Sequence, residues 1–109
     1  MARDEGLEEL LREDFKAEAE LTEKAMFGGR AWLLHGNLLC GARDDGMLVR
    51  LGKGNDGWAL ELADISPMMM RGWPMQGWVR AGPEAFGDDV LRGKLLNAAL
   101  AFARSLPEK

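Results

Sequence analysis

One histidine and one cysteine are the side chains of this sequence best suited to nucleophilic chemistry. Cys40 follows His35 by five residues, and the Gly36-Asn37 dipeptide between them is typical of a tight turn. A hairpin at this turn brings the two side chains near one another, as a Cys–His pair requires. Because strand side chains alternate between the two faces of a sheet, the same hairpin can equally separate them. We expect Cys40 to be a small core residue and the chain not to be an enzyme.

The other chemistry-bearing patterns fall short of a metal or nucleotide site. Asp44 and Asp45 stand in a predicted turn without a third carboxylate nearby, and one histidine with one cysteine cannot form a zinc site. Residues 46–53 run from a glycine to a lysine, as a phosphate-binding loop does. Their spacing is wrong by one residue, however, and Gly54 stands where such a loop needs Ser or Thr. We therefore expect no cofactor and no metal.

Arg50 and a segment rich in methionine and tryptophan are the stronger candidates for binding. Arg50 lies in an apolar, strand-length run, and an unpaired charge there would be costly to bury. An internal ion pair with a helix carboxylate would satisfy it, and so would a bound partner. Met and Trp side chains recur at positions 68–70, 73, 75 and 78. Such residues are enriched at adaptable interfaces and also fill irregular cores, so both alternatives stay open.

The segment 24–30, Lys-Ala-Met-Phe-Gly-Gly-Arg, separates an acidic first part of the chain from an apolar remainder. Adjacent Gly28 and Gly29 permit positive φ and a close approach of two backbones. One interpretation is a hinge between a helix and a sheet, with Met26 and Phe27 in the core. The alternative is a loop that binds an anion or a partner.

Length and composition favour one globular domain spanning residues 1–109. Apolar residues make up 47% of the chain and charged residues 29%. No apolar run approaches the ~20 residues that a membrane-spanning helix needs, and the beginning of the chain is acidic rather than like a signal peptide. A single cysteine fits a reducing compartment. These features predict a cytoplasmic protein that makes no membrane contact.

Charge is distributed unevenly along the chain, whose formal net charge is −4. Residues 1–23 hold nine Asp and Glu against three Lys and Arg, whereas residues 24–109 hold nine against eleven. This weak basic excess makes direct nucleic-acid binding uncertain, because phosphate recognition usually needs a clear basic patch. The alternative of a nucleic-acid-binding module would use the arginines of the sheet, namely Arg30, Arg43, Arg50, Arg71 and Arg80.

Hydrophobic periodicity predicts an α+β fold. Three- and four-residue spacing predicts helices over residues 5–20 and from Asp88 or Asp89 to about 106, with a short helix over 57–63. Strand-length runs bounded by turn residues lie at 31–35, 38–42, 47–51, 68–70 and 75–81. The expected order is therefore α-β-β-β-α-β-β-α. It corresponds to a five-stranded antiparallel sheet with helices packed mainly on one face.

Several of these segments together resemble the TfoX/Sxy N-terminal domain family, named for bacterial regulators of competence for DNA uptake. The resemblance covers nearly the whole chain. It includes Lys24 before Met-Phe-Gly-Gly, the Gly36-Asn37 turn, Cys40-Gly41, the Leu-Val-Arg strand that ends at Arg50, and the block from Gly72 to Trp78. The resemblance implies a small α+β domain that self-associates. The full-length regulators also carry a C-terminal helical domain that this chain lacks, and Arg30 and Trp32 depart from the family pattern.

The resemblance and the residue types together predict a non-enzymatic regulatory or accessory module, linked to transcription, that acts through protein contacts. We expect a protein partner, which the resemblance places in the transcription machinery, and a possible homodimer. The less favoured alternative is a small-ligand-binding protein. The candidate partner-binding residues are Lys24, Met26, Phe27, Gly28, Gly29, Arg30, Arg50, Met75, Gly77 and Trp78.

Overall fold

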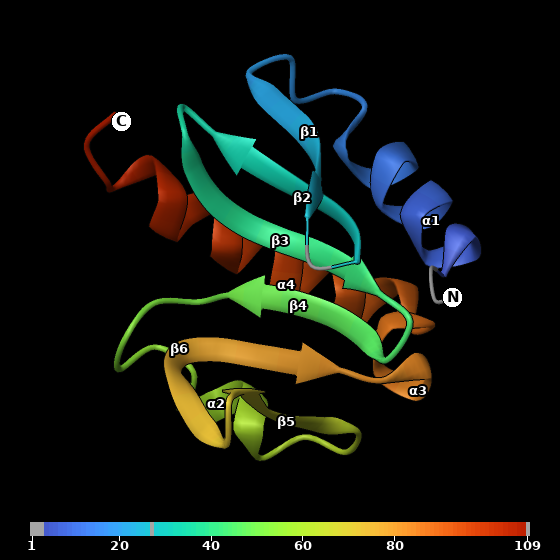
Figure 1. Cartoon of the computed structure of the whole chain (residues 1–109), viewed down its shortest axis with the longest axis vertical. Coiled ribbons are helices and arrows are strands. Elements are labelled where there is room, and N and C mark those ends of the chain that lie inside the picture. Colours follow the sequence, from blue (N-terminus) through green and yellow to red (C-terminus); the bar gives the residue numbers. More distant parts are fainter. Residues whose placement is uncertain (1–3, 27, 109) are drawn as a thin grey trace.

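The computed structural model describes residues 4–26 and 28–108 and has the expected α+β architecture (Figure 1). Helices cover one face of an antiparallel sheet. The elements in chain order are α1 (Glu5–Phe15), β1 (Leu21–Met26), β2 (Gly29–Leu34), β3 (Asn37–Arg43), β4 (Gly46–Arg50), α2 (Gly57–Leu60), β5 (Ile65–Met70), β6 (Trp73–Ala81), α3 (Pro83–Phe86) and α4 (Asp89–Arg104).

Six strands of the described residues form one sheet in the order β1-β2-β3-β4-β6-β5. All five strand pairings are antiparallel, and tight turns connect β1 to β2, β2 to β3, β3 to β4 and β5 to β6. The chain leaves the sheet after β4, forms α2, and returns as β5 at the far edge. As a result β6 lies between β4 and β5, and α4 lies behind the middle strands in Figure 1.

The main core lies between the sheet and the helices. Strand residues that alternate along one face, such as Cys40, Met47 and Val49, are fully buried there. They pack against Leu11 of α1 and Leu95 of α4. Alternation of side chains along each strand thus supplies one continuous apolar layer, as sheet geometry requires.

A second, smaller core lies on the opposite face of the sheet. It contains Leu48, Met68 and Trp78, with Leu38 and Met75 partly buried against it. The pairing of β5 with β6 is irregular between Pro67 and Met69, and β6 curves strongly in Figure 1. The curved β5–β6 hairpin thereby covers part of the face opposite the main core.

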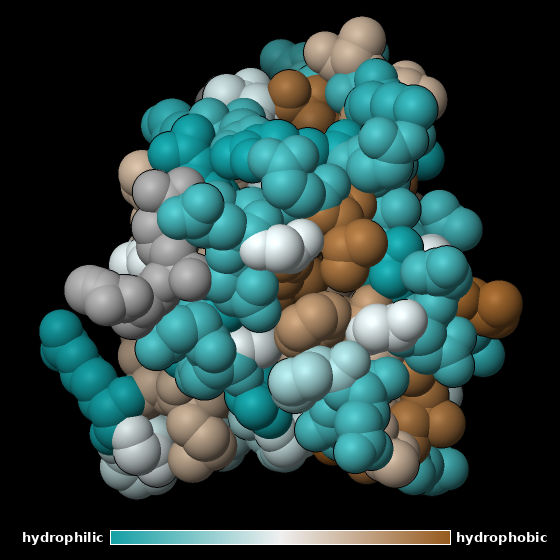
Figure 2. Space-filling model, turned by 90° about the vertical axis from the view of Figure 1, so that its right-hand side faces the viewer, coloured by the Kyte–Doolittle hydropathy of each residue, from teal (hydrophilic) through white to brown (hydrophobic). Residues whose placement is uncertain are grey.

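Polar caps and ion pairs fix the two long helices. Asp4 caps α1 by accepting from Leu7 N, and Asp88 caps α4 by accepting from Val90 N and Leu91 N. Arg92 of α4 is buried and donates from Nε to Asp14, at 2.6 Å. This pair joins α1 to α4 and raises the pKa of the Arg92 guanidinium through its hydrogen bond to Asp14. The side that carries α1 and α3 is mostly hydrophilic, with small apolar patches between the polar side chains (Figure 2).

The predicted hinge at 24–30 is wrong, because the described residues of this segment belong to two paired strands or to the turn between them. Lys24 and Met26 lie in β1, whereas Gly29 and Arg30 begin β2, and Met26 pairs with Gly29. The sheet thus has a sixth strand that the predicted order omitted. The side chains of this strand are exposed or half-buried, and several are polar. The sequence therefore shows no alternation of apolar residues there.

The other differences concern the lengths of elements and the position of one turn. The first helix ends at Phe15 rather than near residue 20, and α2 ends at Leu60 rather than near residue 63. The turn between β2 and β3 is His35-Gly36, both with positive φ, rather than Gly36-Asn37. The short helix α3 was not predicted, because only Pro83 at its first position marks it in the sequence.

Candidate functional site

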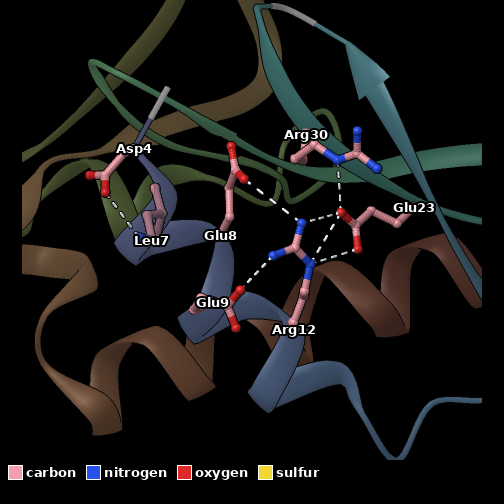
Figure 3. Close-up of polar contacts among 7 residues, drawn as sticks. All are labelled: Asp4, Leu7, Glu8, Glu9, Arg12, Glu23 and Arg30. Carbon is pink, nitrogen blue, oxygen red and sulfur yellow. Dashed lines mark hydrogen bonds and ion pairs between the residues drawn. The ribbon is translucent and has the colours of Figure 1, made fainter. Parts of the chain in front are cut away.

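Arg30, a predicted contact residue, belongs to an ion-pair network that attaches α1 to the β1–β2 hairpin (Figure 3). Arg12 of α1 donates to Glu23 of β1 from Nη2, at 2.8 Å, and from Nε, at 3.1 Å. Arg30 Nε donates to the same carboxylate at 2.8 Å, and Arg12 Nη1 donates to Glu9. The hydrogen bond from Arg12 is the main cause of the lowered pKa of Glu23. This network explains Arg30 as a structural residue.

The rest of the predicted loop lies at the same corner of the sheet. Lys24 is exposed on β1 and Met26 is half-buried at its end. Gly28 has a φ of 76° with open space where a side chain would be, whereas a Cβ on Gly29 would overlap the carbonyl oxygen of Ala42. Phe27 lies outside the described residues. Gly29 is therefore required for the close approach of β2 to β3, and Gly28 for the turn itself.

Arg50 lies at the opposite end of β4, where it pairs with Trp78 of β6. The expected ion pair is wrong: among the described residues, no carboxylate lies within ion-pair distance of its guanidinium. Arg50 Nη1 instead donates to the carbonyl oxygen of Leu38 at 3.3 Å, and its Cζ lies 5.3 Å from the ring centroid of Phe102 in α4. A carbonyl dipole and an aromatic face therefore stabilise this guanidinium.

Trp78, Gly77 and Met75 hold the base of the β5–β6 hairpin. Trp78 is 9% exposed in the second core, and Met75 is half-buried beside it. Gly77 has a φ of 86°, and a Cβ there would lie 2.6 Å from the amide nitrogen of Lys53. Its carbonyl oxygen accepts from Leu51 N and Gly52 N. The structure therefore brings Arg50, Gly77 and Trp78 together but keeps them apart from the 24–30 hairpin.

The exposed apolar residues of this region lie at the tip of the β5–β6 hairpin. Trp73 is 75% exposed, Met69 52% and Met70 38%. The two-residue turn Arg71-Gly72 has φ values of 53° and 83°, as in the type I′ turns that match the twist of paired strands. In the sequence, the clustering of Met and Trp indicated that this segment forms either an interface or part of an irregular core. Curvature of β6, which sequence periodicity does not report, decides which of these side chains face solvent.

His35 and Cys40 are not arranged as a catalytic pair. His35 lies exposed in the turn, within 3.6 Å of carboxylate oxygens of Glu20 and Glu108. Cys40 is fully buried in the main core, and burial raises the pKa of its thiol. Within residues 4–26 and 28–108, no three His, Cys, Asp or Glu side chains are grouped so that they could hold a metal ion.

Most arginines proposed for nucleic-acid binding are held by partners within the chain. Arg43 donates to Asp45 through Nε and Nη2, at 2.9 and 2.6 Å, and these bonds lower the pKa of Asp45. Arg80 Nε donates to the Asp45 carbonyl oxygen at 2.5 Å, while Arg30 is paired with Glu23. Paired carboxylates reduce the positive potential that phosphate groups would meet.

The described part of the chain contains no helix that is long and apolar enough to cross a membrane. Comparisons of the chain with models of protein families, with curated proteins and with solved structures find no match.

Proposed function

We propose that this protein is a non-catalytic regulatory or accessory module that acts by contacting another protein through the tip of its β5–β6 hairpin. The observation that carries this proposal is the exposure of Met69, Met70 and Trp73 on the two sides of one tight turn. Trp and Met are enriched at the centres of protein interfaces, where a few such side chains supply most of the binding energy. Arg71 at the turn adds a charge suited to a carboxylate at the rim of such an interface.

The resemblance to the TfoX/Sxy N-terminal domain family adds a biological context to this proposal. In that context the module is cytoplasmic and the partner belongs to the transcription machinery. Trp73 of the tip lies within the block from Gly72 to Trp78, on which the resemblance partly depends. A second copy of the chain is the other partner that the resemblance implies.

Photo-cross-linking from position 73 in the native cell tests this function. A photoreactive residue in place of Trp73 should give one discrete adduct, identified by mass spectrometry. The same residue in place of Val90, which is 83% exposed on α4, should give none and serves as the matched control. The adduct should disappear when Met69→Ser and Met70→Ser are added. Equal labelling from both positions would contradict the proposal.

Two further outcomes would decide between the forms of this function. An adduct of twice the chain mass identifies a homodimer, and an adduct with a transcription protein supports the regulatory context. Retention of the wild-type protein on heparin, with a steep dependence on salt, would instead favour the nucleic-acid-binding alternative.

A further inference from the structure

A groove of about 380 Å³ lies between α2, the C-terminal half of α4 and the loop that follows β4. This volume falls in the lower part of the range of small-molecule sites. The groove is on the helix side of the molecule and is separate from the hairpin tip. The residues that line it are Leu51, Asn55, Trp58, Ala98, Ala101, Phe102 and Ser105.

Two aromatic side chains and two alanines are among the residues that line the groove. Trp58 belongs to α2, whereas Phe102, Ala98 and Ala101 belong to α4. A larger side chain at either alanine would take up space in the groove. A lining of aromatic rings and small side chains suits a planar apolar group.

A cation lies over each of the two aromatic rings. Lys94 Nζ lies 4.7 Å from the centroid of the Trp58 ring, and Arg50 Cζ lies 5.3 Å from that of Phe102. Within residues 4–26 and 28–108, neither cation has a carboxylate within ion-pair distance, although Arg12, Arg30, Arg43, Arg92 and Arg104 all do. The groove lining contains no carboxylate either.

We infer that this groove binds a small organic anion with a planar apolar body, such as an aromatic carboxylate. The planar body packs against Trp58 and Phe102, beside Ala98 and Ala101. The positive charges of Lys94 and Arg50, which lie over these rings rather than in the groove lining, attract the carboxylate. The amide of Asn55 and the hydroxyl of Ser105 offer polar contacts in the lining. A cation already placed over a ring needs little reorganisation to accept an anion in addition.

Protein-observed NMR with a matched pair of probes tests this inference. Indole-3-acetate should shift the backbone amides of Ala98 and Ala101 and the indole N–H of Trp58. Indole-3-acetamide, which has the same ring without the charge, should bind about tenfold more weakly. Equal affinity for both probes, or no shift with indole-3-acetate at millimolar concentration, would overturn the inference.

Two variants and one control locate the site. Ala101→Leu, at an exposed position of α4, should abolish the shifts by filling the groove. Lys94→Met combined with Arg50→Met should weaken binding of indole-3-acetate about tenfold, whereas Lys24→Met on β1 should leave it unchanged. Thermal melts establish that each variant is folded. Undiminished binding by Ala101→Leu, or shifts that grow with protein concentration alone because a second copy enters the groove, would refute the proposed ligand.

Discussion

At the scale of single residues, the chain uses its arginines as structural cations more than as a binding surface. Arg12 contacts two carboxylates, those of Glu23 and Glu9. Arg92 joins α1 to α4 through its contact with Asp14. This pattern could not be predicted from sequence, because each pair spans elements whose relative placement depends on the whole sheet. A single sequence shows which residues are charged but not which of them form ion pairs.

Glu23→Gln should destabilise the protein by about 1 kcal/mol at neutral pH, because it weakens the charge-assisted bonds from Arg12 and Arg30. The folded-state pKa of Glu23 is lowered, mainly by the hydrogen bond from Arg12. Its stabilising contribution is therefore complete above the ordinary glutamate pKa of about 4.3 and is lost as the pH falls through the lower folded value. Urea unfolding at neutral and acidic pH measures this difference.

Glu13→Gln is the control for this pH dependence. Glu13 pairs with Lys16 on the surface of α1, where both side chains are about two-thirds exposed, at 66% and 70%. An exposed pair contributes little, so its removal should hardly change the unfolding curve at either pH. A Glu23→Gln variant that loses as much stability in acid as at neutral pH would show that the charge of Glu23 is not what matters.

At the scale of elements, alternation and turn residues predicted β2, β3, β4 and α4 well. The sheet strands of the core carry buried apolar side chains, and Asp88 caps α4 as expected. The strand β1 was missed because Thr22, Glu23 and Lys24 give no apolar pattern, and its pairing with β2 cannot be read from the sequence. The candidate contact residues were predicted by type, but their exposure depends on the curvature of β6.

The two glycines of the β1–β2 hairpin should respond very differently to alanine. Gly28→Ala meets open space and should cost about 1 kcal/mol, the penalty of a positive φ for a residue with a side chain. Gly29→Ala would force its Cβ into the backbone of Ala42 and should cost about 3 kcal/mol or prevent the hairpin from forming. Chemical denaturation of both variants gives the comparison, and similar losses would contradict the hairpin geometry.

At the scale of the whole molecule, the two faces of the sheet have different partners. Helices cover one face, and the curved β5–β6 hairpin partly covers the other, so that its tip remains exposed. Hydrophobic periodicity predicted the face that the helices cover, and the structure confirms it. It did not predict how the hairpin covers the other face, since Met and Trp serve both in the second core and at the tip. The register of β5 on β6, with its irregularity after Pro67, and the curvature of β6 together separate the two roles.

Two tryptophans of this hairpin should therefore differ in their effect on stability. Trp78→Ala removes a buried ring and should cost about 3 kcal/mol. Trp73→Ala removes an exposed ring and should change the free energy of unfolding by less than about 0.5 kcal/mol. Thermal and urea unfolding measure both. A large loss for Trp73→Ala would mean that the tip supports the fold rather than a contact.

The carbonyl oxygen of Gly77 connects two regions that otherwise have separate roles. It accepts from Leu51 N at 2.7 Å and from Gly52 N at 3.1 Å, so one oxygen holds the edge of the groove to the base of the hairpin. Because both regions share these two bonds, we expect the loop after β4 and the hairpin base to open together. A molecule that rigidifies the loop should then also slow hydrogen exchange at the hairpin base.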